Sequence, residues 1–190
     1  IENIDPIRYG KTRNFINGDV TYLSPYISRG VISVKQVKEI VLQKGYKPYQ
    51  VEKFLQELAW REYFQRVWQA KGTSAIINAL KQEQVDVKHT HMISSVANAA
   101  TGIEAIDEQI STLYKTGYMH NHARMYTASI VCNIGRAHWQ KPSKWLYYHL
   151  LDGDLASNNC SWQWVAAAFS SKKYYCNQEN INKHCNSNQR

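Results

Sequence analysis

The feature that most constrains the fold is a succession of apolar stripes with the period of an α-helix. A capping-box pattern at Ser33 and Gln36 opens one stripe, and Gly45 closes it. A second capping-box pattern at Thr101 and Glu104 opens another stripe, which Gly117 closes. No segment alternates apolar and polar residues beside turn residues, so the pattern predicts helices and no sheet.

The same signals predict the rest of the chain. Further helices are expected over 48–71 with Gly72 as the stop, over 119–136, from Pro142 to about Leu150, and over 155–169. Residues 1–22 are predicted to be irregular, 81–100 to be a connector, and the polar tail from Ser170 to be partly mobile. A length of 190 residues suits one domain. The prediction is a single all-α globular domain over residues 1–190.

Charge and aromatic content point to a class of partner. The net charge is +8, and 12% of the residues are aromatic. Positive charge favours an acidic partner such as nucleic acid or phosphate, and interleaved aromatic rings can stack on bases or on a planar cofactor. A slightly basic protein with an aromatic core has the same composition, so both interpretations stay open. No apolar run approaches the roughly 20 residues of a membrane span.

The cysteines and histidines form no metal-binding pattern. Cys132, Cys160, Cys176 and Cys185 contain no CxxC pair, so free thiols in a reducing cytoplasm are expected. No secretory signal is recognised, which agrees with a cytoplasmic location. Two His-x-His pairs occur, but residues i and i+2 of a helix point to different sides, so no metal site is predicted. These pairs are His89/His91 and His120/His122.

The stretch LAWREYF contains a tryptophan away from the apolar stripe. Trp60 lies about 160° around the helix from Leu58, at about 100° per residue. Glu57 and Phe64 share its side. An indole beside a carboxylate and Arg61 would form a stacking platform with hydrogen-bonding groups. The alternative is a helix packed on both faces, since Val67 continues the same side.

Three other stretches carry polar groups at helix ends. In TYLSPYISRG, Thr21, Ser24, Ser28 and Arg29 are typical of phosphate binding, although serine–proline turns are common. In GYMHNHARMY, cations at the start of a helix oppose its dipole unless an anion lies nearby, for which Asp152 or Asp154 is a candidate; the alternative is a solvated basic turn. The stretch DGDLASNNCSWQW, residues 152–164, contains Asp152 and Asp154 together with two adjacent asparagines and two tryptophans.

Taken in order, four stretches resemble the DNA photolyase/cryptochrome family, specifically its helical FAD-binding domain. They are TYLSPYISRGVIS, ELAWREYF, TGYMHNHARM and DGDLASNNCSWQWVA. The resemblance covers roughly residues 5–168, and residues 169–190 form a divergent tail. It implies a U-shaped FAD in an all-helical domain, light-driven electron transfer, and repair of cyclobutane pyrimidine dimers in DNA. DNA with a flipped dimer is the implied partner, with neither membrane nor metal.

The resemblance also implies roles for individual residues. Phosphate and ribityl contacts fall on Tyr9, Thr21, Leu23 and Ser24, and the cavity lining on Phe54, Glu57 and Arg61. Flavin-side positions are Asn121 and Arg124, with Arg124 expected to pair with Asp152. Asp154 would hydrogen-bond the cofactor, and Asn158 would face flavin N5. The implied catalytic residues are Trp162, Trp139 and Asn158. Substrate or DNA contacts fall on Arg13, Glu57, Trp60, Arg61, Asn121, His122, Met125 and Trp164.

Four departures bear on activity. The α/β antenna domain that precedes this region in the family is absent from this chain, and Val20 stands where a hydroxyl residue is common. Val96 stands where the outer tryptophan of the electron chain is usual, so Tyr118, Tyr126 or Trp145 would have to substitute. The tail after Trp164 differs from that of most repair enzymes.

Three functions therefore remain. The first is a photolyase, and the second is a cryptochrome-like photoreceptor or flavin module without repair activity. The third is a scaffold that has lost its flavin. Retention of Arg124, Asp152, Asp154 and Asn158 argues against the third function, because a lost site should not keep its buried charges.

Overall fold

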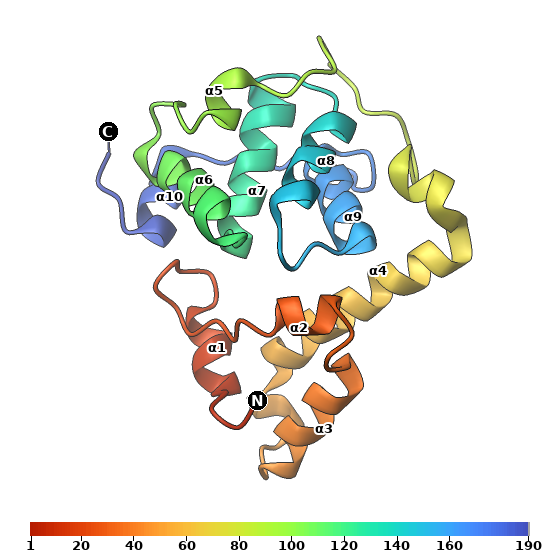
Figure 1. Cartoon of the computed structure of the whole chain (residues 1–190), viewed down its shortest axis with the longest axis vertical. Coiled ribbons are helices and arrows are strands. Elements are labelled where there is room, and N and C mark those ends of the chain that lie inside the picture. Colours follow the sequence, from red (N-terminus) through yellow and green to blue (C-terminus); the bar gives the residue numbers. More distant parts are fainter. Residues whose placement is uncertain (190) are drawn as a thin grey trace.

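The computed structural model describes residues 1–189 and confirms an all-helical domain (Figure 1). In chain order the helices are α1 (Pro6–Thr12), α2 (Ser24–Ser28), α3 (Val34–Gln43), the 3₁₀-helix η1 (Pro48–Gln50), α4 (Glu52–Ile77), α5 (Ser94–Ala97), α6 (Glu104–Thr116), α7 (Asn121–Ser129), the π-helix η2 (Ile130–Ile134), α8 (Gln140–His149), α9 (Leu155–Val165) and α10 (Gln178–Cys185). Within residues 1–189 the β pairing is limited to an isolated bridge between His89 and Ala137.

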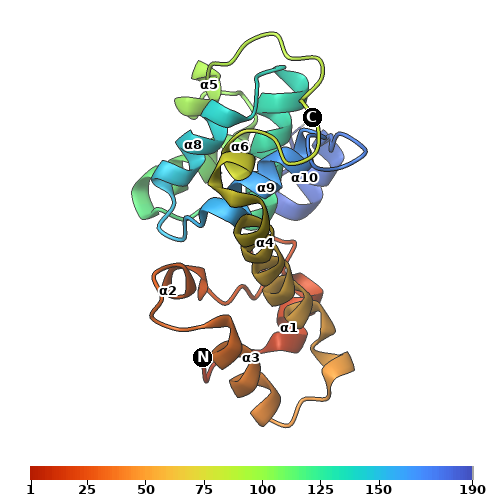
Figure 2. The same cartoon turned by 90° about the vertical axis from the view of Figure 1, so that its right-hand side faces the viewer.

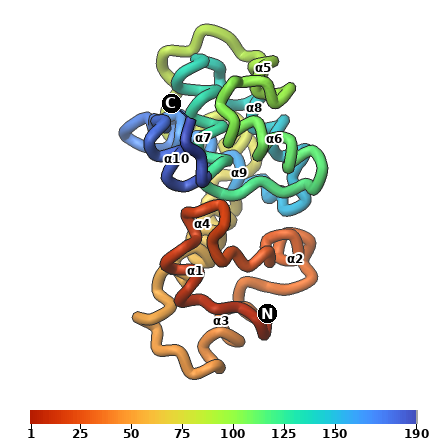
Figure 3. Tube along the Cα trace, turned by 90° about the vertical axis from the view of Figure 1, so that its left-hand side faces the viewer, coloured from red at the N-terminus to blue at the C-terminus, as the bar shows by residue number. Residues whose placement is uncertain are grey.

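The first helices form an N-terminal lobe, which we define as residues 1–58. Helices α1, α2 and α3 gather around the first turns of α4 (Figures 1 and 3). The predicted capping box of α3 is confirmed: Ser33 Oγ accepts from the Gln36 amide at 3.1 Å, and Gln36 Oε1 accepts from the Ser33 amide at 2.8 Å. The core of this lobe is small and consists of Val37, Val41, Val51 and Phe54.

The remaining helices form a C-terminal lobe, residues 94–189, with a larger core. Helices α6, α8 and α10 pack against α7 or α9, and α5 packs against α6 (Figure 1). Burying a large apolar side chain contributes roughly 1.5–3 kcal/mol, so this lobe holds most of the apolar stabilisation. Its largest fully buried side chains include Trp139, Trp162, Tyr126, Ile106, Ile110, Leu113, Met119 and Leu146.

Helix α4 runs from one lobe to the other (Figure 2). The predicted stop at Gly72 is confirmed in part: regular helix geometry breaks at this residue, and a further helical segment of α4 continues beyond the kink to Ile77. Gly72 has φ 79° and ψ 166°, a conformation that only glycine adopts readily. The kink carries Ile76 against α9, where the Ile76 carbonyl accepts from Gln163 Nε2 at 3.0 Å.

The second predicted capping box is not formed. The Thr101 amide and hydroxyl both donate to Asp107 Oδ1, at 2.9 and 2.7 Å, and Glu104 takes no part. The Glu104 amide is bound by Gln189 Oε1 of the tail at 3.0 Å. The predicted stop at Gly117 is confirmed, because this residue ends α6 in the left-handed conformation.

Several helix ends differ from the prediction. The helix expected over 119–136 consists of α7 followed by the π-helix η2, with His120 as the N-cap of α7. Helix α8 begins at Gln140, before Pro142, and α9 ends at Val165 rather than at residue 169.

Both chain ends and the connector 81–100 are more ordered than predicted. Residues 1–22 are not irregular throughout, because Asp5 caps α1 by accepting from the Ile7 and Arg8 amides. The connector 81–100 contains the short helix α5. The tail forms α10, and its Ile181 and Cys185 lie in the core of the C-terminal lobe, which corrects the expectation of a mobile tail.

The four cysteines are free, as predicted. Burial raises the pKa of the Cys160 thiol to about 12 and that of Cys185 to about 11, so both stay protonated at neutral pH. Among residues 1–189, none of the helices has the length and apolar character of a bilayer span. The same residues contain no group of three His, Cys, Asp or Glu side chains that would hold a metal ion.

Candidate functional site

Arg124 and Asp152 form a partly buried ion pair in the C-terminal lobe. Arg124 Nη2 donates to both carboxylate oxygens, at 3.0 and 2.9 Å, and Arg124 Nε donates to the Met119 carbonyl at 2.8 Å. The Asp152 side chain is 5% exposed. The structure thus selects Asp152, rather than Asp154, as the anion that neutralises Arg124.

Asp154 lies at the centre of a second network that joins α9 to α4. Its Oδ1 caps α9 by accepting from the Ser157 amide at 2.7 Å. Its Oδ2 accepts from Arg61 Nη2 at 3.4 Å and from Gln65 Nε2. Each carboxylate of the Asp152–Asp154 turn therefore faces its own arginine, and both charges are compensated.

Ser28 links this network to the N-terminal lobe. Arg61 Nη2 donates to Ser28 Oγ at 2.9 Å, and Ser28 Oγ donates to the Asp152 carbonyl at 2.8 Å. The Ser28 hydroxyl, whose sequence context is typical of phosphate binding, is thus hydrogen-bonded to Arg61 and to the Asp152 carbonyl. Gln65 was missed by the sequence analysis, although its position one turn after Arg61 places both on one face of α4.

Asn158 projects from the second turn of α9. Its Nδ2 donates to the Ser143 carbonyl and to Asn159 Oδ1, both at 3.0 Å. Its Oδ1 accepts from none of the described residues and is not among their fully buried atoms without a partner. Asn158 therefore offers one open acceptor.

The predicted tryptophans fall into two groups. Trp139 and Trp162 are 1% and 2% exposed and belong to the core of the C-terminal lobe. Trp60 and Trp164 are 54% and 43% exposed. The exposure of Trp60 contradicts the alternative of a helix packed on both faces and agrees with a surface platform, against which Tyr63 and Phe64 pack at 5.6 and 5.8 Å between ring centroids.

Arg13 and Glu57 meet at the junction of α1 and α4. Arg13 Nη1 lies 2.9 Å from Glu57 Oε1, and both side chains are half-buried. Burial raises the pKa of the nearby Tyr9 phenol, and the Glu57 carboxylate adds to this effect. Tyr9 packs edge-on against Phe54, with ring centroids 5.2 Å apart. Four predicted residues therefore form one cluster in the N-terminal lobe.

His122, one of the implied DNA contacts, is packed against other rings and does not stand free on the surface. Its ring lies 5.3 Å from that of Tyr126 and 4.7 Å from that of His184 in the tail helix. Burial, followed by the neighbouring His184 and His120, lowers the pKa of His122 to about 4. At neutral pH this ring is uncharged, so it cannot act as a cation toward DNA phosphate. Asn121 is exposed and Met125 is half-buried on the same helix.

The loop before α2 reaches across to the C-terminal lobe. Tyr22 has a φ of 52°, and its ring lies 5.1 Å from that of Tyr118. The Arg124 guanidinium lies 5.8 Å from the centroid of the same Tyr118 ring. This aromatic bridge, which sequence periodicity gave no means of finding, connects the loop of Thr21, Leu23 and Ser24 to the Arg124–Asp152 pair.

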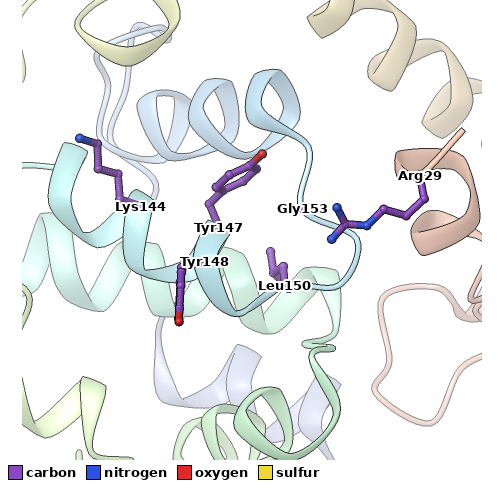
Figure 4. A pocket seen from close by; sticks show the side chains of 6 residues that line it. All are labelled: Arg29, Lys144, Tyr147, Tyr148, Leu150 and Gly153. Atoms are coloured by element: carbon purple, nitrogen blue, oxygen red, sulfur yellow. The ribbon is translucent and has the colours of Figure 1, made fainter.

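Two pockets adjoin these groups. One, of about 380 Å³, lies beside the Asp152–Asp154 turn, and of the residues singled out in the sequence only Arg29 lines it (Figure 4). Its lining is Arg29, Lys144, Tyr147, Tyr148, Leu150 and Gly153, and Arg29 extends from the N-terminal lobe toward Gly153. The other, of about 270 Å³, lies in the N-terminal lobe and includes Thr21 and Leu23 in its wall.

The residues present fit the implied FAD. The predicted residues combine compensated charges, an open amide acceptor and half-buried hydroxyls, a mixture that suits a large, uncharged ring system with a polar chain. His120 Nε2 and Ser157 Oγ are buried without a hydrogen-bond partner, and both belong to elements that carry predicted cofactor residues. A buried polar atom without a partner is costly, and a bound polar ligand would relieve this cost.

Curated relatives of the chain are deoxyribodipyrimidine photo-lyases. The protein of Synechococcus sp. is 28% identical over 169 residues, which cover 84% of this chain and 35% of the relative. The protein of Salmonella typhimurium is 31% identical over 125 residues, which cover 60% of this chain and 25% of the relative. The chain thus spans about a third of the length of the curated relatives it matches.

Solved structures share the fold. A bacterial class III photolyase from Agrobacterium tumefaciens and a cryptochrome from Synechocystis sp. both give a TM-score of 0.79, at 23% and 24% identity. Each match covers 94% of this chain and 39% of the other. The sequence pattern of the family described as "FAD binding domain of DNA photolyase" matches residues 54–188. The chain therefore belongs to the family of photolyase FAD-binding domains, and FAD is its cofactor.

Proposed function

We propose that this domain holds FAD beside the Asp152–Asp154 turn and that the protein repairs cyclobutane pyrimidine dimers in DNA. FAD, when bound, supplies the light-driven one-electron chemistry. The Arg124–Asp152 pair would flank the flavin, and Asn158 would face its N5 edge. Phosphate and ribityl contacts would come from Tyr9, Thr21, Leu23 and Ser24, and the cavity lining from Phe54, Glu57, Arg61, Asn121 and Asp154.

The two buried tryptophans would supply electrons to the site. Trp162 lies one turn after Asn158 on α9, and Trp139 lies in the same apolar core. A dry, aromatic environment suits indoles that pass electrons without exchanging protons with solvent. Both side chains are also held too deeply to contact DNA, which separates this role from that of the exposed tryptophans.

The observation that carries the repair proposal is the exposed Trp60. Trp60 and Tyr63 are 54% and 46% exposed, and their rings pack together beside Phe64, so they form an exposed aromatic patch of the kind that marks an interaction site. Base-flipping enzymes, photolyases among them, must take the lesion out of the stack, and an aromatic ring can receive it. The net charge of +8 favours binding of DNA.

The test uses the full-length natural protein loaded with FAD. We expect illumination to remove the dimer from an oligonucleotide that contains one. Trp60→Ala should weaken dimer binding by about 1–3 kcal/mol, the usual contribution of a base–aromatic stack, while the flavin spectrum stays unchanged. The matched control is Tyr49→Ala, another aromatic residue, 72% exposed on η1. An equal loss of dimer affinity in Trp60→Ala and Tyr49→Ala would contradict a specific role of Trp60 as a stacking platform.

A second candidate is a cryptochrome-like photoreceptor or flavin module without repair activity. Two observations favour it. Val96 is 1% exposed in the core, so no aromatic side chain occupies the position of the outer tryptophan. The tail places His184 over His122, one of the implied DNA contacts. Bound flavin without dimer loss would support this candidate, and a protein that takes up no FAD would contradict both.

A further inference from the structure

Asn159, the neighbour of Asn158, is buried and joins two elements. It is 4% exposed. Its Nδ2 donates to the Ile76 carbonyl of α4 at 3.4 Å, and its Oδ1 accepts from Asn158 Nδ2 at 3.0 Å. Because a carbonyl can only accept, Ile76 determines which end of the Asn159 amide faces α4. The opposite end, an acceptor, is thereby directed at Asn158.

The amide of Asn158 is oriented by the same logic. The Ser143 carbonyl of α8 can only accept, and Asn158 Nδ2 donates to it at 3.0 Å. Asn159 Oδ1 takes the second hydrogen of that amide. A rotated Asn158 amide would set its own oxygen against two other oxygens, so this rotation is disfavoured. The group left open is the Asn158 oxygen.

We propose that Asn159 is a positioning residue that locks the Asn158 amide so that only its carbonyl oxygen faces the flavin. The inference rests on the proposed placement of Asn158 at flavin N5. A pure acceptor stabilises a ring nitrogen that carries a hydrogen and disfavours one that does not. Asn159 would therefore raise the flavin's reduction potential without contacting the cofactor.

The contact with Ile76 alone does not account for Asn159. Gln163 of α9 is fully buried and also donates to the Ile76 carbonyl, at 3.0 Å, while its Oε1 accepts from the Leu80 amide at 2.9 Å. Ile76 therefore keeps a hydrogen-bond donor when Asn159 is replaced. The specific contribution of Asn159 is toward Asn158, and Gln163 is a matched position that lacks this contribution.

The test has two readouts on the full chain loaded with FAD. The first is hydrogen exchange of the ¹⁵N-labelled Asn158 side-chain amide, which follows the lock directly. We expect Asn159→Ala to speed this exchange about tenfold, whereas Asn159→Asp, which keeps an acceptor oxygen, retains the protection. The second is the flavin's midpoint potential, which should fall in Asn159→Ala and stay unchanged in the matched control Gln163→Met.

The outcomes separate the inference from the proposed function. An Asn158 amide that stays protected in Asn159→Ala overturns the inference. An equal fall in potential in Gln163→Met also overturns it, because the effect would then be general loosening of α4 and α9. Loss of protection in Asn159→Ala, together with an unchanged potential in both Asn159→Ala and Asn158→Ala, overturns the placement of Asn158 at the flavin and the inferred effect with it. If Asn159→Ala does not fold, Asn159→Asp decides by its amide exchange: rapid exchange overturns the lock.

Discussion

His120 is an uncharged imidazole enclosed in the C-terminal lobe. It is 2% exposed, and its Nδ1 accepts from the His122 amide at 3.2 Å, which caps α7. Burial, with a smaller contribution from the Arg124 guanidinium, lowers the pKa of His120 to about 4. The ring therefore serves as a hydrogen-bond acceptor at neutral pH, and its protonation would remove the cap.

This low pKa predicts how stability depends on pH. An unfolded histidine titrates near 6.5, so between about pH 6.5 and pH 4 the unfolded chain binds one more proton here than the folded chain. The stabilisation is complete above about pH 6.5 and decreases as the pH falls toward 4. At about 1.4 kcal/mol per pKa unit, a shift from 6.5 to about 4 makes the contribution of His120 on the order of 3 kcal/mol. The lowered pKa of His122 acts in the same direction.

Urea unfolding at pH 7.0 and pH 4.5 measures this effect, and His120→Asn is the matched variant. Asparagine keeps an acceptor at the N-cap but has no proton to take up in this range. We expect the variant to lose less stability than the natural chain over this interval. Identical losses would contradict a buried, uncharged His120.

At the scale of single residues, the sequence predicted the charges of the site better than its neutral groups. Cations at the start of α7 suggested a nearby anion, with a solvated basic turn as the alternative, and the Arg124–Asp152 pair decides for the anion. Gln65 and Asn159 carried no comparable signal, because an uncharged amide fits a surface or a core equally well. Their partners, Asp154 and Ile76, lie 89 and 83 residues away in the chain. Only tertiary contacts reveal what such amides do.

At the scale of elements, Gly117 fixes where α6 ends and how the Asp152 turn approaches it. Its φ is 70°, and a Cβ atom added there would lie 2.5 Å from Leu151 Cγ. The Leu151 amide donates to the Gly117 carbonyl at 2.8 Å, so the two segments cannot separate freely. A side chain at position 117 therefore meets both a conformational penalty and a steric one.

We predict that these two penalties can be separated. Gly117→Ala should cost about 1 kcal/mol for the left-handed conformation and a further 1–3 kcal/mol, roughly, for the overlap with Leu151. In a Leu151→Ala background the overlap disappears, and the same substitution should cost only about 1 kcal/mol. Chemical unfolding of the four chains gives the cycle. Equal costs in both backgrounds would contradict the steric contribution.

Capping patterns in the sequence located helix starts only where no residue distant in the chain binds the same hydroxyl or amide. The capping box of α3 formed because Ser33 and Gln36 bind each other. The matching pattern at Thr101 failed because Asp107 binds the Thr101 hydroxyl and the tail residue Gln189 binds the Glu104 amide. Helix α10 was missed because Ile181 and Cys185 alone make too short a stripe. Such a helix owes its stability to packing rather than to propensity.

At the scale of the whole molecule, two lobes are joined by α4 and by contacts that flank it. Ser28 reaches the Asp152 carbonyl, and Tyr22 packs on Tyr118. The tail makes the third connection, because the Ile16 amide donates to the His184 carbonyl at 2.9 Å. In Figure 3 the loop after α1 lies beside α10. Contacts between such distant segments are invisible to helical periodicity, which is why the all-α class was predictable and the arrangement of lobes was not.

The His184 ring makes the third connection testable. It lies 5.2 Å from the Phe15 ring and 4.7 Å from the His122 ring, and its Nδ1 lies 3.2 Å from the Tyr126 hydroxyl. Aromatic pairs of this kind contribute about 0.5–1.5 kcal/mol each. His184→Ala should therefore release the segment 13–18 from the C-terminal lobe while leaving the core of the N-terminal lobe intact.

Amide hydrogen exchange distinguishes this local opening from general unfolding. In His184→Ala we expect faster exchange at Ile16 and unchanged exchange at Val37 and Val41, which belong to the separate core of the N-terminal lobe. The control is Lys183→Ala, an exposed neighbour on α10. Faster exchange in both regions would mean that the lobes unfold together. Slow exchange at Ile16 would mean that the backbone contact holds without the ring. A tail that fastens residues 13–18 over His122 is supported only if exchange is faster at Ile16 and unchanged at Val37 and Val41.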